Sequence, residues 1–310
     1  MDTLKLILEF VAFPGFLFSA TVGLLSTWVD RKVTAKVQYR QGPPWFQPFA
    51  DILKLLGKEI FVPEGAPQFV FLAIPLVGLA AVILVSTMLW TFNADPGAGF
   101  IGDLLVVLYL LTVPSLALII GGSASRNPMG ALGASREMKL ILGYELPFLI
   151  AVFVVVARTG SIIFGNIINY QSVHGPILMS ASGLLAFIVV LLAVQAKLGY
   201  APFDIAEAEQ EIMAGPLVEY SGAPLALFRL TKAILFFVLP VFMITLFLGG
   251  IDISWAGIAW FLVKYAVILT LVIVIKNTNP RLRIDQAVRV FWGPILGLAA
   301  AAFILALIGW

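Results

Sequence analysis

The stretch FVFLAIPLVGLAAVILVSTMLWTF, residues 69–92, decides the fold class of this chain because it contains no charged side chain. A bilayer core requires about 20 mostly apolar residues in a helix that rises about 1.5 Å per residue. Stretches of similar character recur along the chain. The eight predicted membrane-spanning helices cover roughly 4–29, 69–92, 104–122, 140–157, 177–197, 225–250, 254–276 and 287–310.

The composition agrees with this assignment. Of the 310 residues, 61% are hydrophobic and 12% are charged, and that charged share is about half of the roughly 25% typical of soluble domains. Such a chain has too few polar groups to cover a surface that faces water. The sequence therefore predicts an all-α integral membrane protein, with residues 1–310 forming a single polytopic domain in the cell membrane.

Several kinds of site are excluded by residues that the chain lacks. It contains no cysteine, so this chain cannot form disulfides, thiolate zinc sites or cysteine-ligated iron–sulfur clusters. Its one histidine, His174, cannot supply both ligands of a bis-histidine haem. The formal net charge of +2 does not indicate a nucleic-acid partner. We therefore expect no metal, cofactor or catalytic residue in this chain, and we place any redox chemistry in partner subunits.

The distribution of Lys and Arg between the loops predicts the orientation. Basic residues concentrate in four loops, at about 30–68, 123–139, 197–224 and 276–286, whereas the loops on the opposite side hold only Arg158. Because cytoplasmic loops carry an excess of Lys and Arg, these four loops are predicted to face the cytoplasm. Both termini then lie on the outer side.

The first of these loops contains an amphipathic segment, FQPFADILKLLGKEI, at residues 46–60. Its helical periodicity predicts one apolar stripe, made of Phe49, Ile52, Leu53, Leu56 and Ile60. This pattern is typical of a helix that lies in the membrane interface or packs across the bundle. The helix is either a purely structural element or part of a platform on which a soluble partner docks.

The third loop is unusually acidic and includes Asp204, Glu207, Glu209, Glu211 and Glu219. If 204–213 is helical, Asp204, Glu207 and Glu211 share one face at i, i+3 and i+7. Carboxylates that lie so close together repel one another. This repulsion raises some of their pKa values and favours proton exchange near neutral pH. The alternative is an ordinary solvated acidic loop.

Ionisable residues inside the spans are few. Glu145 lies near the start of the fourth span and Lys264 near the middle of the seventh. Intramembrane charges are costly and mark an ion path or a partner inside the bundle, although Glu145 could be interfacial and Lys264 a structural counter-ion. Arg229, Lys232 and Arg289 lie near predicted helix ends, where we expect their side chains to snorkel to the membrane surface.

Four segments together resemble one known family. They are WVDRKVTAKVQYRQGPP (28–44), DILKLLGKEIFVPEG (51–65), GALGASREMKLILGYELP (130–147) and APFDIAEAEQEIMAGPLVEYSG (201–222). This pattern resembles the membrane heel component of respiratory complex I (subunit 1, or the H subunit in bacteria) and its relatives in membrane-bound nickel–iron hydrogenases.

Departures from that pattern indicate the branch of the family. Quinone-reducing members usually have a longer glycine-rich stretch where this chain runs GPPWFQPFADILKLL (42–56), and they usually have Glu and Arg where this chain has Lys197 and Tyr200. The chain therefore looks more like the group 4 hydrogenase branch, or the related membrane-bound sulfur reductases.

The resemblance implies a membrane anchor that moves ions. The partners would be hydrogenase-like large and small subunits, which carry iron–sulfur clusters and a nickel–iron (or nickel-free) site, together with antiporter-like and small membrane subunits. The expected ion pathway comprises Glu145, Asp204, Glu207, Glu209, Glu211, Glu219 and Lys264. The expected docking face for the soluble arm comprises Asp30, Arg31, Lys32, Arg126, Arg136 and Lys139.

Other functions stay open at this point. The chain could be the quinone-chamber subunit of an NADH- or ferredoxin-quinone oxidoreductase, the membrane subunit of a sulfane-sulfur reductase, or a passive anchor. A stand-alone secondary transporter would usually show repeated halves, and this sequence has no obvious internal repeat. Neither the electron acceptor nor the choice between H⁺ and Na⁺ follows from the residues.

Overall fold

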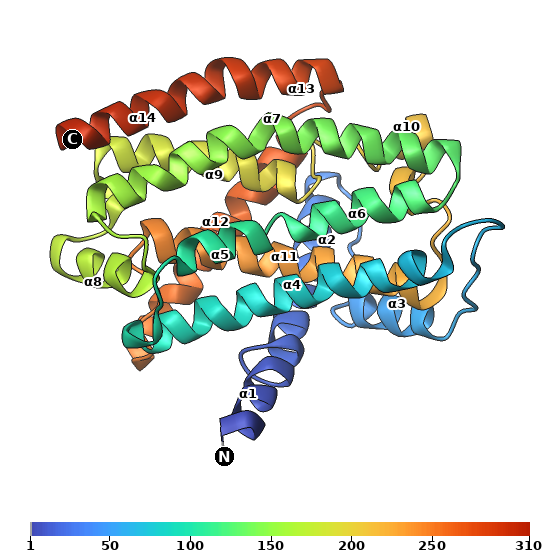
Figure 1. Ribbon diagram of the computed structural model, residues 1–310, viewed down its shortest axis with the longest axis horizontal. Helices are drawn as coiled ribbons and strands as arrows, with labels where there is room; N and C mark the ends of the chain where they lie inside the picture. Colours follow the sequence, from blue (N-terminus) through green and yellow to red (C-terminus); the bar gives the residue numbers. More distant parts are fainter. Residues whose placement is uncertain (1) are drawn as a thin grey trace.

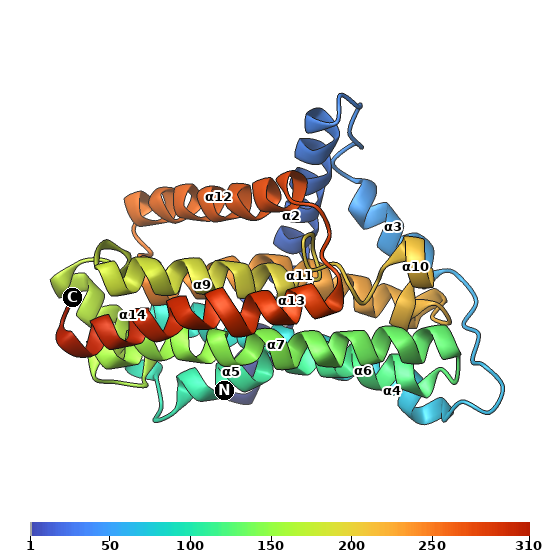
Figure 2. The same cartoon turned by 90° about the horizontal axis from the view of Figure 1, so that it is seen from above.

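The computed structural model describes residues 2–310, with the side chains of residues 7–208 and 211–310. All regular structure in this described part is helical, which confirms the predicted all-α class. Most of the long helices run side by side along one direction, whereas α2 crosses them steeply and α12 runs obliquely to them (Figures 1 and 2). The α-helices are α1 (Asp2–Val11), α2 (Phe16–Val37), α3 (Gln47–Leu56), α4 (Gln68–Ala94), α5 (Asp103–Leu110), α6 (Val113–Ala124), α7 (Pro128–Thr159), α8 (Phe164–His174), α9 (Ala181–Lys197), α10 (Glu209–Ile212), α11 (Gly222–Phe247), α12 (Trp255–Thr278), α13 (Ile284–Val290) and α14 (Leu296–Ile308).

The predicted spans are present, with one of them shorter than expected. Within the described residues, 7 helical segments are long and apolar enough to cross a bilayer. The predicted span 177–197 corresponds to α9, an apolar helix of 17 residues preceded by the short 3-10 turn η2 (Ile177–Met179). This helix lies within the bundle, as shown by its many buried residues.

Prolines divide several spans, as expected from the missing N–H and the steric demand of the proline ring. The first span is two helices, α1 and α2, separated at Pro14 and Gly15. The third span is likewise interrupted between α5 and α6, immediately before Pro114. In the last span, a π-helical turn containing Pro294 (η4, Phe291–Ile295) joins α13 to α14.

The start of α7 differs most from the sequence prediction. The fourth span was expected at 140–157 after a loop at 123–139, but α7 begins at Pro128. Asn127 caps it, because its side-chain oxygen accepts a hydrogen bond from the N–H of Met129 at 2.8 Å, and Pro128 suits the first turn, where no N–H partner is needed. Residues 128–139 are therefore helical, and this places Glu137 inside a helix.

The amphipathic segment forms α3, but its apolar face is rotated from the predicted one. Pro48 and Leu55 are buried, and Phe49 and Ile52 pack against the main core. Leu53, by contrast, is 69% exposed, and Leu56 and Ile60 are exposed as well. The predicted stripe therefore holds only for its first two members.

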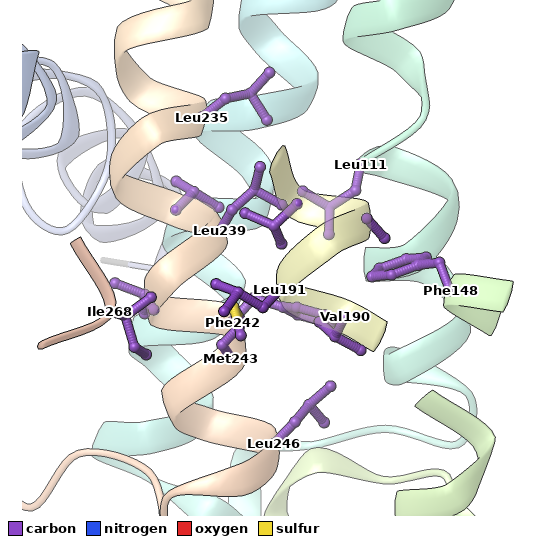
Figure 3. Packing of buried hydrophobic residues seen from close by; sticks show 14 of the residues in the cluster. Leu111, Phe148, Val190, Leu191, Leu235, Leu239, Phe242, Met243, Leu246 and Ile268 are labelled. Carbon is purple, nitrogen blue, oxygen red and sulfur yellow. The ribbon is translucent and has the colours of Figure 1, made fainter. Parts of the chain in front are cut away.

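Helix α11 forms the centre of the bundle. In its most apolar stretch 94% of the residues are buried, compared with 28% for residues 284–308 at the edge. Leu239, Phe242 and Leu246 of α11 lie in the main core together with Val190 of α9 and Phe148 of α7 (Figure 3). A helix that is apolar on all sides is stable only where neighbours surround it, so α11 orders the other helices around itself.

A glycine allows α2 to approach α11 closely. A Cβ added at Gly23 would lie 2.4 Å from the carbonyl oxygen of Ala233, and small residues at such crossings let two backbones meet in a membrane.

We expect Gly23→Ala to lower the thermal midpoint of the purified complex, because the new methyl group would force α2 away from α11. Overpacking of this kind typically costs about 1–3 kcal/mol. The matched control is Gly297→Ala in α14, where no atom lies within 4 Å of the added Cβ. Equal midpoints for the two variants, measured by intrinsic fluorescence, would contradict the close crossing.

Candidate functional site

A polar cavity of about 350 Å³ lies where α6, α7 and α11 meet the end of α9 and the loop 198–221. Figures 1 and 2 show these helices as neighbours in the bundle. The cavity is lined by apolar residues and by ionisable side chains of both signs. The ionisable lining residues are Glu137, Lys197, Asp204, Glu207, Arg229 and Lys232.

Lys232 and Glu207 form one ion pair in this cavity. The Lys232 ammonium donates a hydrogen bond to a Glu207 carboxylate oxygen at 2.8 Å, and each side chain is about one-third exposed. The snorkelling of Lys232 stays a prediction, and the sequence analysis did not foresee that a carboxylate of this chain balances its charge. Glu207, which was predicted for the ion pathway, lies at the cavity wall.

Lys197 and Glu145 form a second and more buried pair. Their nitrogen and oxygen lie 3.0 Å apart, and the Lys197 side chain is only 2% exposed. The Lys197 ammonium also lies 5.0 Å from the ring centroid of Tyr144 and 4.8 Å from that of Phe148, a distance at which aromatic faces attract cations. The sequence singled out Glu145 but not its partner.

Glu137 lines the same cavity as Lys197, Glu207 and Lys232 and was missed by the sequence analysis. Its residue is 5% exposed, and its carboxyl interacts with the Ser115 hydroxyl and electrostatically with Glu207, Lys232 and Lys197. Among the described residues, no cation lies within ion-pair distance of Glu137. Its buried position could have been inferred from the helical periodicity, because Glu137, Leu140 and Tyr144 lie on one buried face of α7.

Tyr200 connects the cavity to a third ion pair. The ammonium groups of Lys232 and Lys276 lie 5.4 Å and 4.5 Å from the centroid of its ring. Lys276 of α12 in turn donates a hydrogen bond at 2.6 Å to Asp30 of α2, which is buried. Burial, followed by the negative charges of Asp30 and Glu207, raises the pKa of the Tyr200 phenol, so this tyrosine stays neutral between two cations.

The acidic loop does not form the expected helix. Only Glu209–Ile212 is helical, as α10, so Asp204, Glu207 and Glu211 do not share a helical face. Glu211 is exposed and pairs with Arg136 and Arg281, and the hydrogen bond from Arg136 lowers the pKa of Glu211. Because a lowered carboxyl pKa favours the ionised form, this pair persists at neutral pH and weakens only in acid.

The remaining residues predicted for the ion pathway lie elsewhere. Glu219 accepts a hydrogen bond from the Asn127 side chain. Lys264 donates hydrogen bonds to the carbonyl oxygens of Leu248, at 2.6 Å, and Gly250, at 3.3 Å, so it satisfies the backbone at the C-terminal end of α11. The side chain of Glu209 lies outside the described residues.

The predicted docking residues are also distributed unevenly. Arg31 pairs with Asp51 at 2.8 Å; burial opposes ionisation of Asp51, but hydrogen bonds from Arg31 and Gln47 outweigh it and lower its pKa. Lys32 reaches the carbonyl oxygen of Gly42 at 3.5 Å. Arg126 and Lys139 are exposed, whereas the Asp30 carboxylate is engaged inside the chain.

Together, the bundle and the charged cavity define a class of protein: a multi-pass membrane subunit that keeps several ion pairs inside a helical bundle. The comparisons with known proteins agree. The family model described as NADH dehydrogenase matches residues 10–307. The H subunit of the NADH-quinone oxidoreductase of Thermomicrobium roseum is 36% identical, over 96% of this chain and 95% of the relative.

Two further similarities extend over nearly the whole chain. NADH-quinone oxidoreductase subunit 8 of Thermus thermophilus is 33% identical, over 92% of this chain and 83% of the relative. The solved structure of an archaeal respiratory membrane complex, the membrane-bound sulfane sulfur reductase, contains a chain with a TM-score of 0.87 and 29% identity, covering 98% of this chain and 99% of that one.

This chain therefore belongs to the NADH dehydrogenase family that includes subunit 1 of complex I and its bacterial counterpart, the H subunit. It is a membrane subunit of a complex I-like oxidoreductase in the cell membrane, and it functions as part of a multisubunit respiratory complex. The resemblance inferred from the loop motifs is confirmed at the level of the family.

We predict strong energetic coupling between Lys197 and Glu145. Lys197→Met leaves a carboxylate inside the bundle without its cation, and Glu145→Gln leaves a buried ammonium; breaking a buried pair in this way typically costs about 3–5 kcal/mol. The double variant should recover most of this loss, as judged from the thermal midpoint of the purified complex.

The control is the same cycle on the more exposed pair Arg31–Asp51, whose side chains are 46% and 29% exposed. Exposed pairs typically contribute about 0.2–1 kcal/mol. Additive losses in the Lys197–Glu145 cycle would show that the two charges are stabilised by other groups.

Proposed function

We propose that this chain is the ion-translocating membrane anchor of its complex and couples electron transfer in a docked peripheral arm to the movement of protons or Na⁺. The observation that supports this most strongly is the cavity that Glu137 lines together with the Lys232–Glu207 pair and with Lys197, which pairs with Glu145. Charges inside a membrane bundle are costly, and their usual use is ion transfer.

The arrangement suits transfer of a proton in steps. Glu137 interacts with two lysines and with Glu207, so the charge at any one of these groups affects the others. In a low-dielectric site, a change of one charge strongly alters the proton affinity of its neighbours. A proton reaching Glu207 from the loop side could thus pass to Glu137 and then to Glu145, with Lys232 and Lys197 balancing the charge.

The soluble partners belong to the same proposal. We place the segments at about 30–68, 123–139, 197–224 and 276–286 on the cytoplasmic side, where Arg31, Lys32, Arg126 and Arg136 would contact the peripheral arm. That arm would consist of hydrogenase-like large and small subunits carrying iron–sulfur clusters and a nickel–iron (or nickel-free) site. Antiporter-like membrane subunits would receive the translocated charge. The similar fold of a chain of the sulfane sulfur reductase, which extends over nearly the whole of both chains at 29% identity, supports a place near this branch.

A second candidate is that the cavity accepts a quinone. Its volume of about 350 Å³ falls within the range of ligand pockets, and several relatives are named as quinone oxidoreductases. Lys197 and Tyr200, however, stand where quinone-reducing members usually have Glu and Arg, and Lys197 is already paired with Glu145. Quinone extracted from the purified complex in stoichiometric amounts would favour this alternative.

A passive anchor does not account for the cavity. An anchor needs apolar helices and a docking face, and replacing buried ion pairs by apolar residues is often neutral or stabilising. The three lysines that meet carboxylates inside this chain therefore indicate a function other than attachment.

We expect Glu137→Gln to abolish coupling while the complex assembles normally. Glutamine keeps the size of the side chain but cannot exchange a proton near neutral pH. Because a positioned proton-transfer group typically contributes about 10²-fold or more to rate, ion transport per electron in sealed vesicles should fall by at least about tenfold. Dye-linked activity of the peripheral arm should change little.

The matched control is Glu64→Gln, which makes the same replacement at an exposed position of the first loop. Transport is compared at equal turnover with a pH-sensitive dye and with radioactive sodium, which also distinguishes H⁺ from Na⁺. Full transport in Glu137→Gln vesicles would mean that the ion path avoids the cavity.

A further inference from the structure

A second hollow lies on the outside of the bundle, between α7 and α13. It is an open groove of about 500 Å³, and this region of α13 and α14 forms one edge of the molecule (Figures 1 and 2). The floor is mostly apolar, with Leu142 and Val288 among its members, and Leu142 is 64% exposed. The groove therefore opens towards the surroundings of the bundle and is separate from the charged cavity.

Two cations border this groove without a partner. Lys139 of α7 and Arg289 of α13 both line it and are both exposed. In the described part of the chain, neither has a carboxylate within ion-pair distance. Asp285 also lines the groove, but it lies in the first turn of α13, where the helix N-terminus favours a negative charge. The groove thus has an excess of positive charge.

A tryptophan completes the arrangement. Trp292 lies in the groove with 55% of its surface exposed, and its indole N–H donates a hydrogen bond to the Leu142 carbonyl oxygen at 3.2 Å. Tryptophan is enriched at the level of the lipid headgroups because its ring is amphipathic, with an apolar body and a polar N–H group. Lys139 lies in the segment 123–139 and Arg289 lies close to the segment 276–286, both of which the positive-inside pattern assigns to the cytoplasm, so all three residues fit the headgroup region.

We propose that this groove binds the phosphate-bearing headgroup of an anionic phospholipid. Lys139 and Arg289 would contact the phosphate, Trp292 would lie at the level of the glycerol backbone, and the acyl chains would cover Leu142 and Val288. Basic pockets between transmembrane helices on the cytoplasmic side are known to suit anionic headgroups. The proposal does not depend on the ion-transport function.

A helix of a neighbouring membrane subunit fits this groove less well. Such a helix would bring apolar side chains to two cations that already lack partners, which leaves their charges unbalanced at an interface. A lipid phosphate supplies the missing negative charge and the apolar chains in one molecule.

The test uses the whole complex, purified and depleted of lipid, with lipid binding followed by native mass spectrometry. Phosphatidylglycerol is titrated against phosphatidylcholine, in the wild type and in the variant Lys139→Gln/Arg289→Gln. The control variant, Lys54→Gln/Lys58→Gln, removes two exposed positive charges from the same predicted side of the membrane. Each basic residue near the surface contributes roughly fivefold to attraction of an anionic lipid, so we expect about 25-fold weaker binding of phosphatidylglycerol in the groove variant and little change in the control.

Other outcomes would overturn the proposal. Equal losses in both double variants would show non-specific attraction by net charge. Equal binding of phosphatidylcholine, which has no net charge, would show that the groove does not select an anionic headgroup. Displacement of the lipid by millimolar inorganic phosphate would indicate a site for soluble phosphate. Loss of a membrane subunit from the groove variant would identify the groove as a protein interface. If the double variant does not assemble, the single variants Lys139→Gln and Arg289→Gln test the same point, with about fivefold weakening expected for each.

Discussion

A lysine ammonium inside a membrane bundle has to meet a polar partner, and three lysines that meet carboxylates organise one end of the molecule. Lys197 ends α9 and reaches Glu145 of α7, Lys232 of α11 reaches Glu207 in the loop 198–221, and Lys276 of α12 reaches Asp30 of α2. An unpaired charge in this environment would cost several kcal/mol. Each pair therefore determines which segments, distant in the sequence, lie next to one another.

The central helix α11 meets the same constraint in two ways. After Lys232 it is buried as far as Phe247, and Leu239, Phe242 and Leu246 lie in the core (Figure 3). Lys232 is neutralised by Glu207, whereas the carbonyl oxygen of Leu248, at the C-terminal end of the helix, receives a hydrogen bond from Lys264. A charge that looked like part of an ion path in the sequence thus satisfies backbone acceptors that a helix C-terminus leaves open.

The fold could be predicted from the sequence because long apolar runs have few alternatives in a membrane. The interruptions next to Pro14 and Pro114 agree with the missing N–H of proline, whereas Pro75, Pro147 and Pro240 lie inside continuous helices. The candidate functional site was harder to predict from the sequence. Glu137 was assigned to a loop because the cap at Asn127 was not recognised, and the partners of Lys197 and Lys232 depend on tertiary contacts that no local pattern encodes. The predicted helix at 204–213 does not form over its full length. Glu207 pairs with Lys232 in the cavity, whereas Glu211 pairs with Arg136 at the surface, and no local pattern predicts these separate partners.

That divergence has a functional meaning within the proposed mechanism. Tyr200 and Glu207 both contact Lys232, while Glu211, only four positions after Glu207, is held at the surface by Arg136 and Arg281. One short segment therefore forms both a wall of the cavity and part of the outer face. If the peripheral arm changed the contacts of Glu211, the backbone between Glu211 and Glu207 would move. This movement would shift Glu207 relative to its partner Lys232. A shift of even one ångström there alters the distance between two charges in a low-dielectric site, where electrostatic energy is most sensitive to distance. In the proposed mechanism, the backbone between Glu211 and Glu207 would therefore transmit a movement at the surface to the cavity, where it would change the proton affinity of the carboxylates.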